Sequence, residues 1–361
     1  MRKAKTVFFI TLIGIFSIGS KLDDSAIYCT VINPVNFYLY DTLLIISDSV
    51  AGIHIYSVKN PQAPKFRMRI PLKGNTGIAM KDNVVYANSW GSILAIRLTG
   101  VSSYEIAKYI KEDPYYHPLP IDYNNGFSCF PSSTAPVAAG SDLGGSSGTG
   151  GSYAIFAVIG SYLYYLDGSS IITMDISTPA APNQLSSTYI NWTSETLFPT
   201  KKYLFVGGSG GMYVLDRSNP ANPTTVGTLT HFRAKDPVVV QDTVAYVTLR
   251  TTRDFSAAQD ELLAVSLSSI TNPYILSEKP LYTPYGLTVS DTLLYVGNGA
   301  NGFSLLNVKN PSQMYVIKSW QTPSVKDFIW QGSRLYVMTF GEIMIYDVTD
   351  PLAPVQLATI Q

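Results

Sequence analysis

Hydrophobic and polar residues alternate with a period of two in short runs along most of this chain. The last part shows the pattern clearly, in the runs KDFIWQG (326–332), SRLYVMTF (333–340), EIMIYDV (342–348) and PVQLATIQ (354–361). A period of two is typical of half-buried β-strands, and the chain lacks the 3.6-residue period of amphipathic helices. The pattern therefore predicts four short strands in this part of the chain.

The third of these runs is one of seven related copies. Six of the seven copies end in a proline, and four of these six carry another proline three residues earlier. The copies are GIHIYSVKNPQAP (52–64), SILAIRLTGVSS (92–103), IITMDISTPAAP (171–182), GMYVLDRSNPANP (211–223), ELLAVSLSSITNP (261–273), GFSLLNVKNP (302–311) and EIMIYDVTDPLAP (342–354). Seven copies predict an array of seven structural units.

A landmark residue in a short strand precedes each copy. The landmarks are Ile45, Tyr86, Tyr164, Phe205, Tyr246, Tyr295 and Tyr336. Four of the six intervals are 41 residues, for example from Tyr164 to Phe205 (205 − 164). The other two are 78 (164 − 86) and 49 (295 − 246), which predicts insertions at 104–152 and 251–260.

Four strands per unit of this length predict an all-β fold, a β-propeller of seven four-stranded blades over residues 26–361. The repeats begin near residues 35, 76, 154, 195, 236, 285 and 326, and the insertion at 104–152, with its Gly/Ser linker, is expected outside the ring. The first proline should end the third strand and the second should open the outer edge strand, where a missing N–H costs little. Either 26–32 or 354–361 could supply the outer strand of the last blade.

The first 20 residues have the layout of a secretory signal peptide. A basic head (Arg2, Lys3, Lys5) precedes an apolar run from Val7 to Ile18, which is short for a membrane span. We expect cleavage near Lys21 and a location in the periplasm or at the cell surface, without a transmembrane span in the mature chain. The alternative is an uncleaved segment that anchors the protein in the membrane.

The composition of the chain limits the kinds of molecule that it is expected to bind. Removing residues 1–20 leaves 22 basic residues (25 − 3) against 25 acidic ones, so no basic field exists for nucleic acid. Export permits a disulfide between Cys29 and Cys129, the only two cysteines, but their spacing leaves pairing open. The three histidines have no partner at metal-ligand spacing, so we expect neither a metal nor a cofactor.

The quoted units resemble the LVIVD repeat, over roughly residues 34–361. The resemblance is closest at 148–170, ETLFP (195–199), 236–250 and YGLTVSDTLLYVGNG (285–299). It implies an exported bacterial β-propeller of a family without an assigned activity, whose members are often lipoproteins. This chain has Lys21 where a lipidation cysteine would stand, so the resemblance does not extend to a lipid anchor.

Two motifs associated with enzymes are better explained as turns. GGSGG (207–211) matches the nucleophile elbow around Ser209, and GNGANG (297–302) matches a dinucleotide-binding fingerprint. Both motifs require a following helix, and here a strand-like run follows each. We therefore assign no catalytic residue to either.

The repeat register places one residue per blade at the start of the innermost strand, ten positions before the landmark. In the last four units these residues are Glu195, Asp236, Tyr285 and Lys326, and Trp192, His231, Arg233 and Lys235 precede them. Because innermost strands converge on the axis of a propeller, these side chains are candidates for a ligand site at the mouth of the central channel. Alternatively, a carboxylate there ties neighbouring blades together by accepting backbone N–H bonds.

The sequence favours a monomeric, non-catalytic binding or scaffolding module whose partner is a protein, a glycan or a small polar ligand. The alternative is a hydrolase or lyase in which Glu195 and Asp236 form an acid/base pair, with pKa values separated by Lys235 and Lys326.

Overall fold

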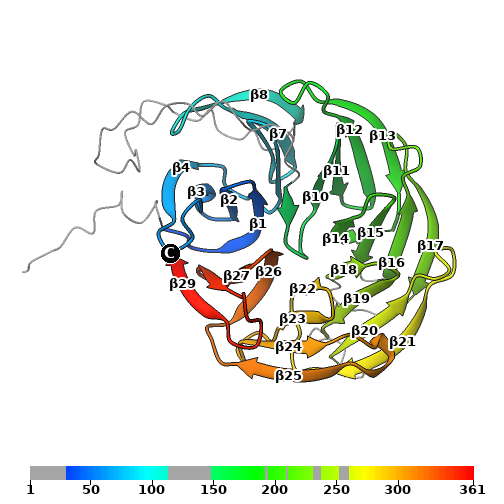
Figure 1. The fold of residues 1–361 in the computed structure, drawn as a ribbon. Helices are drawn as coiled ribbons and strands as arrows, with labels where there is room; N and C mark the ends of the chain where they lie inside the picture. The colour runs from blue at the N-terminus through cyan, green and yellow to red at the C-terminus, as the bar shows by residue number, and fades with distance from the viewer. Residues whose placement is uncertain (1–29, 113–147, 192–193, 209, 231–236, 252–259) are drawn as a thin grey trace, which may run out of the picture.

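The computed structural model describes residues 30–112, 148–191, 194–208, 210–230, 237–251 and 260–361. In this part of the chain seven antiparallel sheets are arranged as the blades of a closed ring (Figure 1). The protein is an all-β, seven-bladed β-propeller, as the repeat predicted. The four main strands of each blade come from contiguous sequence, with the first of them nearest the axis and the fourth at the circumference.

The strand bounds are as follows. Blade 1 has β1 (Pro34–Tyr40), β2 (Leu43–Asp48), β3 (Gly52–Ser57) and β4 (Lys65–Ile70), and blade 2 has β5 (Ile78–Lys81), β6 (Val84–Ser89), β7 (Ser92–Leu98) and β8 (Tyr104–Lys111). Blade 3 has β10 (Phe156–Ile159), β11 (Tyr162–Asp167), β12 (Ser170–Asp175) and β13 (Asn183–Tyr189), and blade 4 has β14 (Ser194–Pro199), β15 (Tyr203–Gly208), β16 (Gly211–Asp216) and β17 (Thr224–Thr230).

The remaining blades follow the same plan. Blade 5 has β18 (Val238–Gln241), β19 (Val244–Leu249), β20 (Glu261–Ser266) and β21 (Tyr274–Pro280), and blade 6 has β22 (Leu287–Ser290), β23 (Leu293–Gly297), β24 (Phe303–Asn307) and β25 (Tyr315–Trp320). Blade 7 has β26 (Val325–Gln331), β27 (Arg334–Thr339), β28 (Ile343–Asp347) and β29 (Val355–Ile360). A short 3-10 helix, η1 (Pro311–Gln313), precedes β25.

The landmark residues occupy equivalent positions in all seven blades. Each lies in the second strand and pairs with the residue seven positions earlier in the first strand. The pairs are Ile45–Tyr38, Tyr86–Ala79, Tyr164–Ala157, Phe205–Phe198, Tyr246–Val239, Tyr295–Thr288 and Tyr336–Ile329. A one-residue slip would turn every side chain to the opposite face of its sheet. The sequence repeat is therefore a repeat of strand register.

The ring closes by side-chain packing between the first and last blades. Phe37 and Leu39 of β1 share one buried cluster with Ile329 of β26 and Ile343 of β28. The outer strand of the last blade is β29, which pairs with β28, so residues 355–360 fill the position that the sequence left open. Hydrophobic burial rather than exchange of a strand closes this propeller.

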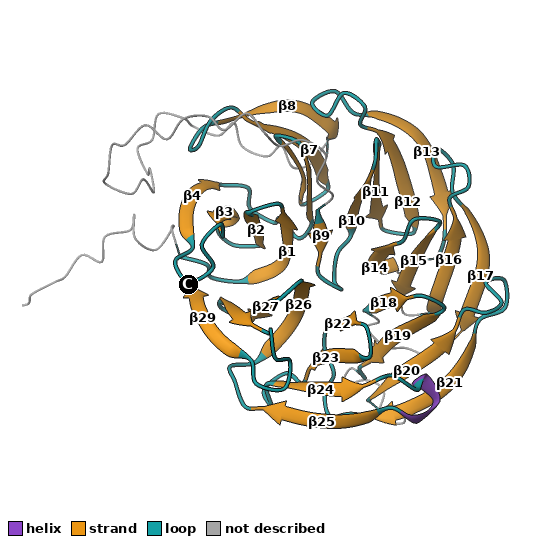
Figure 2. Cartoon of the chain, viewed as in Figure 1, coloured by secondary structure: helices purple, strands orange, loops and turns teal. Residues whose placement is uncertain are grey.

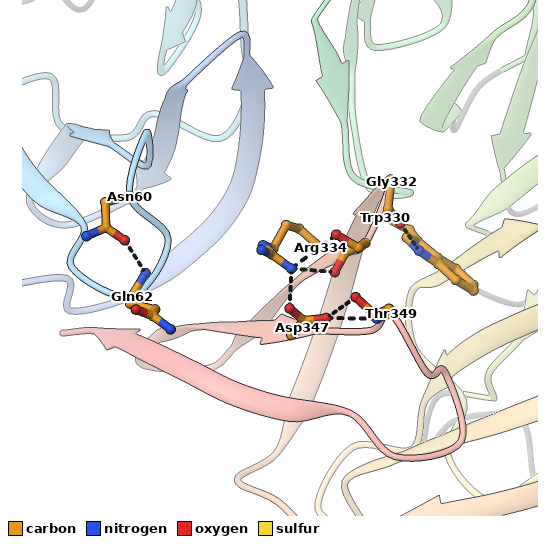
Figure 3. Close-up of polar contacts among 8 residues, drawn as sticks. Asn60, Gln62, Trp330, Gly332, Arg334, Asp347 and Thr349 are labelled. Carbon is orange, nitrogen blue, oxygen red and sulfur yellow. Dashed lines mark hydrogen bonds and ion pairs between the residues drawn. The ribbon is translucent and has the colours of Figure 1, made fainter.

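The proline-containing turn has the same geometry in several blades. In blade 1 the Asn60 carbonyl accepts a hydrogen bond from Ala63 N at 3.1 Å. The Asn60 side chain accepts a second one from Gln62 N at 3.2 Å, which Figure 3 shows. The corresponding side-chain bonds elsewhere are Asn219–Ala221, Asn310–Ser312 and Asp350–Leu352. Pro61 occupies the second turn position, for which its fixed φ is suited.

The residue that ends the third strand also caps this turn. Asp347 Oδ1 accepts hydrogen bonds from the backbone N and the hydroxyl of Thr349, at 2.8 and 2.6 Å (Figure 3). The second proline immediately precedes the outer strand in five blades, at Pro64, Pro182, Pro223, Pro273 and Pro354. Proline thus stands at the start of an edge strand, as expected from its missing donor.

Three of the landmark tyrosines connect their blade to this turn in the next blade. Tyr86, Tyr164 and Tyr295 donate their hydroxyl protons to the carbonyls of Pro179, Pro220 and Pro351, at 2.9, 2.7 and 2.8 Å. Burial raises the pKa of all three phenols, which keeps them protonated as donors. In these three blades the two features that recur in the sequence therefore meet in one contact between neighbouring blades.

The predicted insertion at 104–152 was wrong at both ends. Residues 104–111 form β8, the outer strand of blade 2, because its side chains are only partly exposed and pack against β7. At the other end, β9 (Thr149–Gly150) pairs with β1 as a fifth strand of the first blade. Within the described part of the insertion, both ends therefore belong to the ring.

Candidate functional site

The segment from Thr149 to Ala154 crosses the axis of the ring before it enters blade 3. β9 lies beside β1 near the centre of the ring (Figure 2), and Gly151 N donates to the Phe37 carbonyl at 3.4 Å. Leu197 N of blade 4 donates to the Ala154 carbonyl at 2.7 Å, and Leu287 N of blade 6 donates to Ser152 Oγ at 3.1 Å. At the level of these contacts, the centre of the ring is therefore occupied by the backbone of residues 149–154.

Asp327 of blade 7 binds this segment. Its carboxylate accepts hydrogen bonds from Ser152 N and Oγ at 3.0 and 2.6 Å, from Tyr153 N at 3.1 Å and from Phe328 N at 2.9 Å. The side chain is fully buried, and burial raises the pKa of the carboxyl to about 6, although the hydrogen bonds from Ser152 and its neighbours oppose this shift. Asp327 is the carboxylate that ties blades together.

The side of the ring where first strands begin and second strands end will be called the upper face. Six side chains gather there, Tyr153 from the axial segment and five from blades 4 to 7: Glu195, Arg250, Tyr285, Lys326 and Phe340. We call this group the axial site. Strand register explains the gathering, because the start of a first strand lies opposite the end of its second strand.

Tyr153 links the members of the axial site electrostatically. Burial raises the pKa of its phenol, the Arg250 charge lowers it, and Asp327, Tyr285 and Glu195 raise it further. The Tyr153 hydroxyl is buried and has no hydrogen-bond partner among the described residues. A buried hydroxyl without a partner is costly, so its position calls for an explanation.

Aromatic and cationic groups stack beside Tyr153. The Arg250 guanidinium lies 3.8 Å from the centre of the Tyr285 ring, and the Tyr285 and Phe340 rings meet edge to face at 5.4 Å. The Lys326 ammonium lies 5.7 Å from the Phe340 ring and donates to the Pro34 carbonyl at 3.1 Å. The Arg250–Tyr285 and Lys326–Phe340 contacts are cation–π interactions. The group combines fixed cations with an apolar surface, since Phe340 is 43% exposed.

Three of the candidate residues from the sequence belong to this group. Glu195 lies in β14, Tyr285 just before β22 and Lys326 in β26, each where its innermost strand begins. A ligand-binding role for them stays a prediction. The other candidates, Asp236, Trp192, His231, Arg233 and Lys235, lie outside the described residues, as do Cys29 and Cys129.

Sequence reasoning missed Asp327, Tyr153, Arg250 and Phe340. Asp327 stands one position later in the register than expected, where blade 1 has Asn36, whose amide donates to the Tyr153 carbonyl at 3.0 Å. Arg250 and Phe340 both lie four residues after their landmarks, as Trp90 does in blade 2. A search of the sequence at the position four residues after each landmark would have found Arg250 and Phe340.

The motifs attributed to turns connect strands. GNGANG joins β23 to β24, and GGSGG joins β15 to β16, with Ser209 itself outside the described residues. Among the residues with described positions, no three His, Cys, Asp or Glu side chains form a group that could hold a metal ion. In the same part of the chain no helix has the length and apolar character needed to cross a membrane.

The fold and the repeats define a class of protein, the seven-bladed β-propellers. More specifically, the chain carries LVIVD repeats, since the model of this family matches residues 150–189, 200–230 and 285–322. Comparison with curated proteins found no match.

Similar solved structures come from different sources. A Lactobacillus plantarum protein has a TM-score of 0.61 at 14% identity, over 91% of this chain and 96% of that one. BamB from Moraxella catarrhalis has 0.55 at 11%, over 85% and 82%. The computationally designed protein Ika8 has 0.57 at 9%, over 91% and 89%. At these identities the similarity concerns the fold alone.

Proposed function

We propose that this protein is an exported binding module that holds a small polar ligand, or a polar group of a larger partner, at the axial site. The observation that carries the proposal is a pair of buried donors. The Tyr153 hydroxyl and Arg250 Nε are both buried without a hydrogen-bond partner among the described residues. Preorganised but unpaired donors lower stability, and a ligand that accepts from them recovers that loss.

The hydrogen bonding of Tyr153 distinguishes a structural role from a role in binding. Most structural polar groups in a protein core are paired, as the Asp327 carboxylate is by its four hydrogen bonds. Tyr153 combines paired and unpaired polar groups. Its backbone N–H donates to Asp327 and its carbonyl accepts from Asn36, while its buried hydroxyl has no partner among the described residues. The backbone holds the residue in place, and the hydroxyl is left for recognition.

Replacing Tyr153 by phenylalanine tests the proposal. We expect the melting temperature of the ligand-free protein to stay the same or rise, because the substitution removes an unpaired buried hydroxyl. We expect ligand-dependent stabilisation, about 2.7 kcal/mol at a hundredfold excess over Kd in the wild type, to fall sharply. The measurement is a thermal-shift screen of small carboxylates, amino acids, glycans and short peptides.

Tyr315→Phe is the matched control, because Tyr315 lies in the exposed outer strand β25 and is 55% exposed. It should leave both the melting temperature and the ligand response unchanged. A Tyr153→Phe variant that melts lower and keeps the full ligand response would refute binding at the axial site.

Export is the second part of the proposal. It rests on the basic and apolar layout of residues 1–20. We expect the mature protein to begin near Lys21 and to be recovered outside the cytoplasm without a lipid. N-terminal sequencing and fractionation are the measurements, and an intact Met1 in the membrane fraction would instead indicate an anchor.

A further inference from the structure

Arg250 has the geometry of an anion receptor. The residue follows β19, and its guanidinium carbon lies 3.8 Å from the centre of the Tyr285 ring, a cation–π contact that positions the group. A guanidinium carries five N–H donors arranged to meet a planar acceptor, and a cation–π contact does not use those donors. No described carboxylate forms an ion pair with Arg250, and its buried Nε has no hydrogen-bond partner in the part of the chain that the structure describes.

Two hydroxyls of the same face add to this donor set. The hydroxyls of Tyr153 and of Ser194, which immediately precedes Glu195, are both buried and unpaired among the described residues. Tyr153 interacts electrostatically with Arg250. Because burial raises the pKa of Tyr153, its hydroxyl keeps its proton at neutral pH and can only donate to an anion.

This inference rests on the proposed function and specifies its ligand. We propose that the axial site recognises the carboxylate of an organic monoanion: the Arg250 guanidinium binds the two oxygens, and Tyr153 donates a further hydrogen bond to one of them. Bidentate guanidinium–carboxylate pairs are short and directional, and they are among the strongest hydrogen-bonded contacts in proteins.

The charges around the site favour one negative charge over two. Glu195 and Asp327 both act electrostatically on Tyr153, so a bound group faces two carboxyl groups besides the Arg250 guanidinium and the Lys326 ammonium, which donates to the Pro34 carbonyl. Like charges at short range are unfavourable, and a phosphate dianion is repelled more strongly than a carboxylate. A carboxylate is therefore the better match to a single guanidinium in these surroundings.

The rest of the ligand is expected to be apolar next to the carboxylate. Phe340 is 43% exposed and contacts the Tyr285 ring edge to face, so apolar surface continues outward from the Arg250–Tyr285 stack. Such a carboxylate can belong to a free acylated amino acid or to the C-terminus of a peptide with an apolar last residue. The chemistry is the same, and chain length distinguishes the two.

Calorimetric titration of the full-length chain tests this assignment. The probes are N-acetyl-phenylalanine, N-acetyl-phenylalanine amide, phenyl phosphate, and acetyl-Ala-Ala-Phe with a free or an amidated C-terminus. We expect each free acid to bind at least tenfold more tightly than its amide, and the phosphate more weakly than the acids. A tripeptide acid that binds more tightly than the single residue points to a peptide terminus, and equal affinities point to a small molecule.

Substitution of Arg250 provides the second arm. Arg250→Gln should weaken binding of the acids at least tenfold and leave that of the amides unchanged, while Arg250→Lys should restore only part of the affinity because it lacks the planar donor pair. Arg97→Gln is the matched control, since Arg97 is an exposed arginine paired with Glu105 in the outer part of blade 2. If Arg250→Gln fails to fold, the comparison of acids with amides on the wild type still decides.

These experiments distinguish failure of the carboxylate assignment from failure of the proposed binding function. Equal binding of acids and amides, or tighter binding of phenyl phosphate, overturns the carboxylate assignment and leaves a binding function at the axial site intact. Absence of binding by every acid also overturns the assignment, whereas the proposed function falls only if the wider thermal-shift screen gives no response that depends on Tyr153.

Discussion

Asp327→Ala is expected to lower the free energy of unfolding by about 3 kcal/mol or more. The substitution strands the backbone N–H groups of Ser152, Tyr153 and Phe328 in the interior, and each unpaired buried donor costs roughly 1–3 kcal/mol. These donors belong to blade 7 and to the segment that crosses the axis, so their loss loosens the centre of the ring. Urea unfolding monitored by tryptophan fluorescence measures the effect.

Asp216→Ala is the control for this prediction. Asp216 also accepts a backbone hydrogen bond, from Ser218 N at 2.6 Å, but it does so at an exposed turn where water replaces the lost acceptor. Its substitution should change the unfolding free energy far less. Equal losses in the two variants would show that Asp327 does not hold the axial segment. Asp327→Asn should be intermediate, because one amide oxygen can still accept while the NH₂ group opposes the remaining donors.

His54→Leu is expected to make the protein more resistant to acid. His54 lies in β3, fully buried, and neither ring nitrogen has a hydrogen-bond partner among the described residues. Burial lowers its pKa from 6.5 to about 4, with Asp48 raising it and Arg69 lowering it to smaller extents. The residue is therefore neutral in the folded protein at pH values where the unfolded chain already binds a proton.

The sign of the effect follows from that difference. Below pH 6.5 the unfolded chain takes up a proton that the folded chain excludes until about pH 4, so acid favours unfolding. The stability that His54 contributes is complete above pH 6.5 and falls by about 3 kcal/mol as the pH approaches 4. His54→Leu should remove this loss and keep the neutral-pH stability, because a leucine has no unpaired buried nitrogen.

Asp327 works in the opposite direction over part of this range. Its pKa is raised from 3.8 to about 6, so it favours the folded state below pH 3.8 and loses that contribution as the pH rises through 6. The two groups partly compensate each other in the wild type. Denaturant unfolding at pH 4.5 and 7.5 should thus show a smaller acid loss in His54→Leu and a larger one in Asp327→Asn. Parallel behaviour of both variants and the wild type would refute these roles.

Much of the fold followed from local patterns that repeat. The 41-residue spacing from Tyr164 to Phe205 corresponds to two residues at the same point of adjacent blades, each paired seven positions back. The prolines marked the third-strand turn and the start of the outer strand because their missing donor and fixed φ restrict them to such places. Proline constraints and period-two alternation act within one blade, so a sequence can show them directly.

The sequence by itself therefore determined the seven units, their strand order, and the starting positions of Glu195, Tyr285 and Lys326 on one face. The tertiary structure alone decided that 104–111 completes blade 2, that Thr149–Ala154 crosses the axis, and that Asp327 binds this axial segment to blade 7. It also brought Tyr153 and Arg250 together. The physical reason is distance along the chain: Asp327 and Ser152 are 175 residues apart, and a hydrogen bond between them depends on ring closure, which no local pattern encodes.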